Sequence, residues 1–273
     1  MGRGMRWGIW GLAVLWAGAQ VVNAQQDTGQ SVERLQLEAA ESAERLDLEL
    51  ALGNAAVQAG RFEAAIASFE KVLGKLEPDS REAGDLHLRM GETYRRMGNS
   101  EAALASLTRA SELLPDQPVV LGTLALVLAG CGKKDEAERA YRATLELDPD
   151  NAIAMNNLAY LLADRGEDLE VALGFARRAG ELMPEDADAI DTTGWVQLKR
   201  KQTDAAIELF ARALSMETGN EGYRQHLLLA LEAKADRSAE MDELKLLLAG
   251  DTATAGGGRV VELLRAVQGS SGK

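Results

Sequence analysis

Cysteine is almost missing from this chain, which contains one, Cys131, among 273 residues. A single cysteine cannot form a disulfide within the chain, so the fold has to rest on packed side chains. Cys131 directly precedes Gly132 at a predicted helix end, and we interpret it as a small helix-terminal residue rather than a redox-active thiol. Because no cysteine lies near the amino terminus, a lipid-anchored form is not expected.

Histidine and catalytic motifs are equally scarce. The two histidines, His87 and His226, have no neighbouring cysteine or carboxylate at the spacing of metal ligands. The chain contains no nucleophile elbow and no paired metal motif, and its glycine run at 256–258 follows no strand pattern, which indicates a linker rather than a phosphate-binding loop. We therefore expect a protein that is not an enzyme and that uses no cofactor and no metal.

Basic residues are outnumbered by acidic ones. The 30 Lys and Arg residues face 43 Asp and Glu residues, which gives a formal net charge of -13. A phosphate backbone demands a basic surface, so the composition excludes nucleic acid as the expected partner. Aromatic residues make up only 4% of the chain against 46% hydrophobic residues. Many small aliphatic side chains and few rings favour helices that pack at short distance.

Proline is rare as well, but its five positions are ordered. Pro115, Pro149 and Pro184 follow one another at steps of 34 and 35 residues, with small and apolar residues at matching distances before each. Proline disfavours helical geometry at the residue before it and removes an amide donor, so it marks the boundaries between helices. This spacing predicts an array of two-helix hairpins.

The second repeat carries the clearest signature. Its apolar and small residues at helical spacing are His87, Met90, Gly91 and Tyr94, followed by Ala103, Leu107 and Pro115. With these residues the chain resembles the tetratricopeptide repeat family, in which each unit of about 34 residues is a helix, a turn and a helix. The resemblance implies an all-α fold, an α-solenoid of antiparallel helix-turn-helix repeats with about five repeats and a degenerate sixth capping repeat.

The repeats are expected over residues 46–248. The predicted units are 46–79, 84–117, 118–151, 152–186, 187–220 and 221–248. Four extra residues precede the second unit, the fourth has one additional residue in its turn, and the fifth has Lys201 and Thr218 in place of the turn glycine and the seam proline. Outside the array we expect a signal peptide (1–24), a helical extension (25–45), a flexible linker (249–258) and a short carboxy-terminal helix with a tail (259–273).

Single residues predict where the helices begin and end. The glycines that suit the left-handed end of a first helix are Gly60, Gly98, Gly132 and Gly166. Pro118 is placed to open a helix, where its missing amide hydrogen costs nothing, and Asn151 is placed to cap one. In the sixth unit Glu240 stands where the other units have a tightly packed alanine, as expected of a terminal repeat that exposes a polar face.

The amino terminus has the features of an export signal. Arg3 and Arg6 precede an apolar stretch over residues 7–19, and small residues allow cleavage after Ala24 or, alternatively, after Ala19. The stretch is shorter than the roughly 20 residues that span a bilayer as a helix, so cleavage is favoured over an uncleaved leader anchored in the inner membrane. The chain thus resembles exported bacterial members of the family, periplasmic or secreted, with no integral membrane span after cleavage.

In the resembled family the first helix of each unit lines a concave groove. Carried over by position, the implied partner contacts are Leu50, Asn54, Val57, Leu88, Glu92, Arg95, Gly122, Leu126, Asn156, Tyr160, Asp191 and Trp195. Tyr160 and Trp195 occupy equivalent places in consecutive units, where the rings either form an aromatic wall for a partner or fill space between the helices. Lysines and asparagines that grip an acidic tail in some members are present only in part, which favours a mixed apolar and polar groove.

Two functions follow from these features. The first is a non-catalytic scaffold or adaptor in the cell envelope that binds a partner protein, as a peptide or a helix, in the concave groove. The alternative is a carbohydrate-polymer or peptidoglycan-associated binding protein, in which Tyr160 and Trp195 would stack on sugars beside Asn156 and Asp191.

Overall fold

The computed structural model describes Val32, residues 46–234 and residues 239–249. Within these ranges the chain forms twelve α-helices and no strand, which confirms the predicted all-α fold. The predicted leader, all of the amino-terminal extension except Val32, linker residues 250–258 and the carboxy-terminal helix lie outside the described residues, as does the side chain of Glu240.

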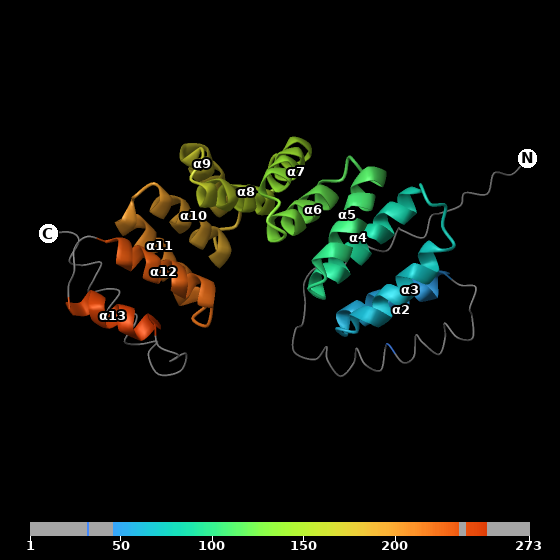
Figure 1. Ribbon diagram of the computed structural model, residues 1–273, viewed down its shortest axis with the longest axis horizontal. Helices are drawn as coiled ribbons and strands as arrows, with labels where there is room; N and C mark the ends of the chain where they lie inside the picture. The colour runs from blue at the N-terminus through green and yellow to red at the C-terminus, as the bar shows by residue number, and fades with distance from the viewer. Residues whose placement is uncertain (1–31, 33–45, 235–238, 250–273) are drawn as a thin grey trace, which may run out of the picture. The chain divides into compact units, whose positions relative to one another are not determined.

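The helices fall into two compact units, residues 1–115 and residues 116–273. The described helices of the first are α2 (Leu46–Gln58), α3 (Phe62–Leu73), α4 (Arg81–Arg96) and α5 (Ser100–Leu113). Those of the second are α6 (Pro118–Gly130), α7 (Lys134–Leu147), α8 (Ala152–Arg165), α9 (Leu169–Leu182), α10 (Ala187–Lys199), α11 (Thr203–Met216), α12 (Glu221–Ala233) and α13 (Ala239–Ala249). They pack as consecutive pairs, from α2 with α3 to α12 with α13 (Figure 1), so each predicted repeat corresponds to one hairpin.

The boundaries between hairpins are set by capping residues. The connection from α3 to α4 covers residues 74–80, whereas the later ones, such as 114–117 and 148–151, are shorter. Ser80 ends this longer connection because its hydroxyl accepts a hydrogen bond from the Ala83 amide at 3.1 Å, so α4 begins before the predicted unit start at residue 84. The side chains that cap later helices in the same way are Asn99, Asn151, Asp186 and Asn220. Pro118 occupies the start of α6, as predicted.

All five turns that end α2, α4, α6, α8 and α10 pass through the left-handed region. The four predicted glycines have φ between 71° and 76°, namely Gly60, Gly98, Gly132 and Gly166. Lys201 takes the same conformation with φ 63°, and the amides of Lys201 and Gln202 donate back to the carbonyls of Leu198 and Gln197, both at 2.9 Å. The turn geometry is thus kept in the fifth hairpin although its residue is not glycine.

Lys201 therefore carries a local strain that a glycine would remove. We expect Lys201→Gly to raise the free energy of unfolding by about 0.5–1 kcal/mol, because relief of the left-handed conformation outweighs the extra entropy of glycine in the unfolded chain. Urea unfolding followed by circular dichroism measures this change. The reciprocal Gly98→Lys, at a position with open space around it, should lower stability. A neutral or negative effect of Lys201→Gly would show that its backbone is not strained.

The helices of a hairpin approach most closely at small residues. A Cβ atom added to Gly53, Gly91 or Gly194 would lie 2.4 Å from Phe69, 2.5 Å from Leu107 and 2.8 Å from Phe210, respectively. In the second helices, a fully buried alanine recurs at the equivalent place: Ala65, Ala103, Ala137, Ala172 and Ala206. These contacts have the register that the sequence predicts.

The sixth hairpin keeps an apolar interior. Leu227, Leu231 and Leu244 are fully buried, as their helical spacing predicts. Leu248 is buried and Leu247 only partly so, because residues four apart lie on one face of a helix and Leu248 follows Leu244 by one such step. α13 packs on α12.

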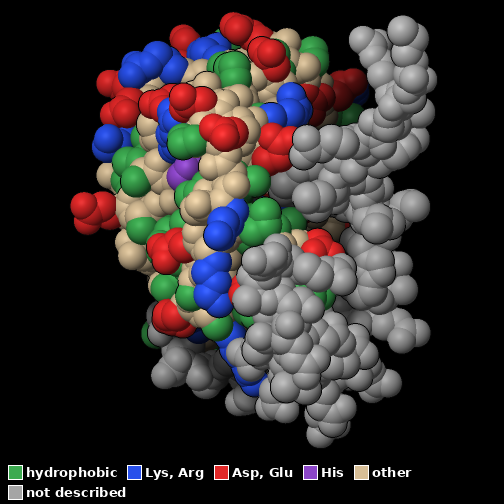
Figure 2. All heavy atoms as spheres, turned by 90° about the vertical axis from the view of Figure 1, so that its right-hand side faces the viewer, with side chains coloured by type: hydrophobic (Ala, Val, Ile, Leu, Met, Phe, Trp, Pro, Cys, Tyr) green, Lys and Arg blue, Asp and Glu red, His purple; other side chains and the backbone are tan. Residues whose placement is uncertain are grey.

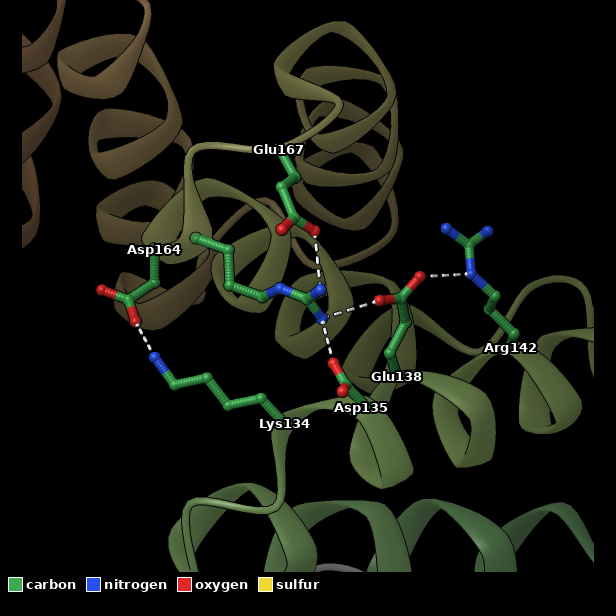
Figure 3. Close-up of polar contacts among 7 residues, drawn as sticks. Lys134, Asp135, Glu138, Arg142, Asp164 and Glu167 are labelled. Atoms are coloured by element: carbon green, nitrogen blue, oxygen red, sulfur yellow. Dashed lines mark hydrogen bonds and ion pairs between the residues drawn. The ribbon is translucent and has the colours of Figure 1, made fainter.

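Charged side chains link the neighbouring hairpins at the α7 and α8 helices. The Arg165 guanidinium contacts Asp135 at 3.0 Å, Glu138 at 3.1 Å and Glu167 at 2.8 Å (Figure 3). Ion pairs near the surface contribute at most about 1 kcal/mol each. We therefore expect this network to orient the helix ends and to add little to the stability of the fold. On the face in Figure 2, acidic and basic side chains also lie next to one another.

His87 on α4 is a half-buried side chain with an unsatisfied ring nitrogen. Its Nδ1 atom is buried and has no hydrogen-bond partner, and burial together with the nearby Arg109 lowers the pKa of the imidazole below its ordinary value. The unfolded chain therefore takes up this proton more readily than the folded chain. The stability contributed by neutral His87 is present above the unfolded-state pKa of about 6.5 and is lost as the pH falls below it.

Removal of His87 should make the fold less sensitive to acid. When the pH falls from about 7.5 to about 5.5, we expect the native chain to lose more stability than His87→Gln. Only the native chain has an imidazole at this position that takes up a proton more readily when the chain is unfolded. Urea unfolding at both pH values measures the difference. Equal losses for the two proteins on acidification would contradict the assignment.

Candidate functional site

Equivalent positions of consecutive first helices lie side by side in the second unit. The rings of Tyr160 on α8 and Trp195 on α10 are stacked, with centroids 5.9 Å apart and planes at 20°. One repeat further, the Asp191 carboxylate contacts His226 Nδ1 at 2.8 Å, and the Tyr223 hydroxyl donates to Asp188 at 2.6 Å. All three contacts join residues 35 positions apart. The predicted juxtaposition of Tyr160 and Trp195 is confirmed.

His226 extends the aromatic pair to a third helix. Its ring stacks on Trp195 with centroids 4.7 Å apart and lies 5.4 Å from the Phe210 ring. The Lys199 ammonium is 4.5 Å from the Trp195 ring centroid, a cation–π contact. We name Tyr160, Trp195 and His226 the ring stack. Only 9% of Trp195 is exposed, so this ring is a packing residue between helices.

Burial separates the predicted contact residues of the second unit into two groups. Asn156, Asp191 and Trp195 are buried, whereas Leu126 and Tyr160 are exposed. The burial of Asp191 and Trp195 follows from the stacking of first helices. Both residues lie on α10, which packs against α8 on one side and α12 on the other. The contact of His226 with Asp191 was not predicted, although the 35-residue spacing that pairs Tyr160 with Trp195 also pairs these two residues.

Two buried polar atoms of this region lack hydrogen-bond partners. They are the Trp195 indole Nε1 and the Asn156 side-chain oxygen. Tyr160 beside them has its pKa raised, first by burial and then by the carboxylates of Asp164 and Asp191. The phenol therefore stays protonated at neutral pH and can donate a hydrogen bond at the edge of the ring stack.

Exposed apolar side chains lie on α6 and α8, the first helices of two consecutive hairpins in the second unit. Val119 is 57% and Leu126 40% exposed on α6, and Ile153 is 65% and Tyr160 38% exposed on α8. Val119 and Ile153 are equivalent by repeat position, as are Leu126 and Tyr160. We name these four residues the apolar patch. Val119 and Ile153 are not among the predicted contacts; each is the second residue of its helix.

The predicted contact residues of the first unit are engaged differently. Leu50 and Val57 are partly buried against the core around Phe69. The Asn54 side-chain oxygen accepts from the Arg89 guanidinium at 3.1 Å. Glu92 and Arg95 form an ion pair with each other at 2.5 Å, and Leu88 is half-buried. Most of these side chains are thus already held by neighbours in their own unit.

Neither a metal site nor a membrane span is found in the part of the chain that the structure describes. No group of three or more His, Cys, Asp or Glu residues there is arranged to bind a metal ion. Across the same residues, every helix falls short of the length and apolar character that crossing a membrane requires.

Two family models match the chain. Both describe the tetratricopeptide repeat, one over residues 56–127 and the other over residues 123–188. Among curated proteins none matches. The matched segments span the hairpins in which the turn glycines, the buried alanines and the apolar patch lie.

Solved structures of repeat proteins resemble the described fold. YrrB, described as a TPR protein with an unusual peptide-binding site, is 20% identical with a TM-score of 0.56 and covers 74% of this chain and 98% of its own. The MamA protein is 22% identical with a TM-score of 0.54 over 65% of this chain and 94% of its own. PilF of Pseudomonas aeruginosa is 24% identical with a TM-score of 0.50 over 69% and 88%. The fold is therefore the all-α solenoid of tetratricopeptide repeats, with the repeats themselves matched over residues 56–188.

Proposed function

We propose that this protein is a non-catalytic scaffold that binds a polypeptide partner on the face formed by its first helices. The observation that carries the proposal is the apolar patch, in which Val119, Leu126, Ile153 and Tyr160 are exposed on adjacent helices at equivalent repeat positions. Isolated exposed apolar residues are common on protein surfaces, but neighbouring ones that repeat in register mark an interaction surface. Tetratricopeptide repeats serve as protein-binding modules, which supports the same function.

A carbohydrate-polymer partner is less well supported. Stacking on a sugar needs a free ring face, and the faces of Trp195 lie against Tyr160, His226 and the Lys199 ammonium. Asn156 and Asp191, which would bind sugar hydroxyls, are buried. Apolar side chains such as Ile153 are suited to the side chains of a protein partner instead.

We also propose that the protein acts in the cell envelope. The support is the sequence of the amino terminus, with Arg3, Arg6 and the apolar stretch 7–19 before Ala24. Intact-mass measurement of the protein recovered from its native host, after separation of periplasm, membrane and cytoplasm, tests this proposal. A mature chain beginning at Gln25 in the periplasm or medium is expected, and a full-length chain in the cytoplasm would overturn it.

The binding proposal is tested by affinity capture with a matched pair of variants. Ile153→Asp places a charge on the apolar patch, and Val171→Asp places one on α9, where Val171 is 45% exposed. Both sites are exposed, so the fold should persist in each. We expect Ile153→Asp to lose the proteins that the native chain retains from an envelope extract, and Val171→Asp to retain them. Equal retention by all three chains would exclude the first-helix face as the binding surface.

A further inference from the structure

The last hairpin exposes leucines on both of its helices. Leu229 on α12 is 45% exposed, and Leu246 on α13 is 75% exposed, the largest value among the large hydrophobic side chains of the described residues. Leu247 beside it is only partly buried. A terminal repeat of a solenoid needs a polar outer face to stay soluble, so these leucines leave the end of the array with an apolar surface.

Leu247 is equivalent by repeat position to residues that are buried in earlier hairpins. On α3, α7, α9 and α11 these residues are Val72, Thr144, Ala179 and Ala213. Each of these four helices packs against the first helix of the next hairpin. Among the described residues no helix follows α13. The outer face of α13 is therefore the place where a further helix would fit.

Leu246 stands where other second helices have a basic residue. The equivalent residues on α5, α9 and α11 are arginines that donate to the connection before their own hairpin, at distances between 3.0 and 3.3 Å: Arg109, Arg178 and Arg212. A leucine cannot make this contact and is suited to an apolar neighbour instead. Asp242, four residues before Leu246, lies on the same face of α13 and is exposed, so the surface there combines an apolar side chain with a carboxylate.

The chain itself contains a segment of fitting chemistry. Residues 259–267 carry two arginines and one glutamate, and four of their apolar residues have the i, i+3, i+4, i+7 spacing of one helix face: Val260, Leu263, Leu264 and Val267. The nine residues 250–258 that precede this segment can span up to about 30 Å. The 11 residues of α13 have a length of about 17 Å, so the segment can reach every turn of that helix.

We propose that residues 259–267 dock as a helix on the outer face of α13, and that this contact keeps the apolar end of one chain from binding other copies. The apolar stripe lies against Leu246 and Leu247, and an arginine lies beside Asp242. A short linker gives the segment a local concentration in the millimolar range, which favours its own chain over a second copy. The inference does not depend on the proposed function, because α13 and the apolar patch share no residue.

Hydrogen exchange of the full chain tests the contact. Leu264→Asp places a charge in the apolar stripe, and the control Val261→Asp places the same charge outside it. We expect Leu264→Asp to raise amide exchange rates in α13 about ten-fold or more, since the burial of about one leucine is lost, and Val261→Asp to leave them within about two-fold. In sedimentation velocity, Leu264→Asp should self-associate more than the native chain, and adding Leu246→Asp should abolish this gain. Equal exchange and equal association in all chains would overturn the inference.

A disulfide trap distinguishes the chain's own segment from that of a second copy. The exposed Cys131 is first removed by Cys131→Ser. Leu246→Cys with Leu264→Cys should then form a disulfide within one chain about ten-fold or more faster than Leu246→Cys with Val261→Cys, because only the first pair faces each other. Disulfide-linked dimers as the main product would assign the segment to a second copy and overturn the inference, as would equal rates for the two pairs. Either result leaves the proposed binding function intact.

Discussion

Replacement of Trp195 by alanine should lower the free energy of unfolding by about 3–5 kcal/mol. The indole is 9% exposed and contacts the rings of both Tyr160 and His226, with Lys199 over its ring. Its removal leaves a cavity where α8, α10 and α12 meet and frees three side chains that pack on it. Urea unfolding monitored by circular dichroism gives the change directly.

The matched variant is Tyr160→Ala. Its ring shares the stack but is 38% exposed, so its loss should cost less than that of Trp195, about 1.5–3 kcal/mol for the part of the ring that is buried and its contact with Trp195. We expect Tyr160→Ala to lose partner binding while it stays folded. The main effect of Trp195→Ala should be a lower free energy of unfolding. If both variants had the same stability, the assignment of Trp195 as a core residue and Tyr160 as a surface residue would be wrong.

Gly53→Ala should destabilise the fold, although alanine is the better helix former. The added Cβ would lie 2.4 Å from a ring carbon of Phe69, which is fully buried and has no free direction in which to move. Overpacking of this kind costs about 1–3 kcal/mol, which exceeds the gain of about 1 kcal/mol in helix propensity. Thermal or urea unfolding measures the net sign.

Gly180→Ala is the internal control. Gly180 lies within α9 and a Cβ atom there meets nothing within 4 Å, so the same substitution should stabilise by about 0.5–1 kcal/mol. In a double-mutant cycle, Gly53→Ala should cost less in a Phe69→Leu background than in the native chain, because the smaller side chain leaves room for the added Cβ atom. A stabilising Gly53→Ala would contradict the close approach of α2 and α3.

The repeat architecture could be predicted from the sequence because each of its determinants is local or periodic. The turn at Gly98 follows from a glycine in the left-handed region, and the contact of Tyr160 with Trp195 follows from equivalent places in consecutive repeats. Even the glycine-free turn keeps its geometry, since Lys201 accepts the strain that the packing of α10 on α11 imposes.

The exposure of the contact residues could not be predicted in the same way. Whether Asp191 and Asn156 face solvent depends on how far the next helix reaches over them, and this is a property of three-dimensional packing. His226 covers Trp195 and holds Asp191, so two residues expected on the surface belong to the interior. The apolar patch shows the reverse case, since its residues Val119 and Ile153 are exposed and were not predicted as contacts. One exposed apolar residue such as Ile153 does not indicate a binding surface by itself, and only the packing of α6 on α8 adds Val119 to the same surface.

The most direct test of the binding surface is site-specific photo-crosslinking. A photoreactive phenylalanine analogue replaces Tyr160 on the apolar patch or, as the control, Val171 on α9, and the chain is irradiated in its native host. We predict that position 160 crosslinks to a discrete polypeptide and that position 171 does not. Crosslinks from position 171 alone, or the same products from both positions, would contradict the assignment of partner binding to the first-helix face.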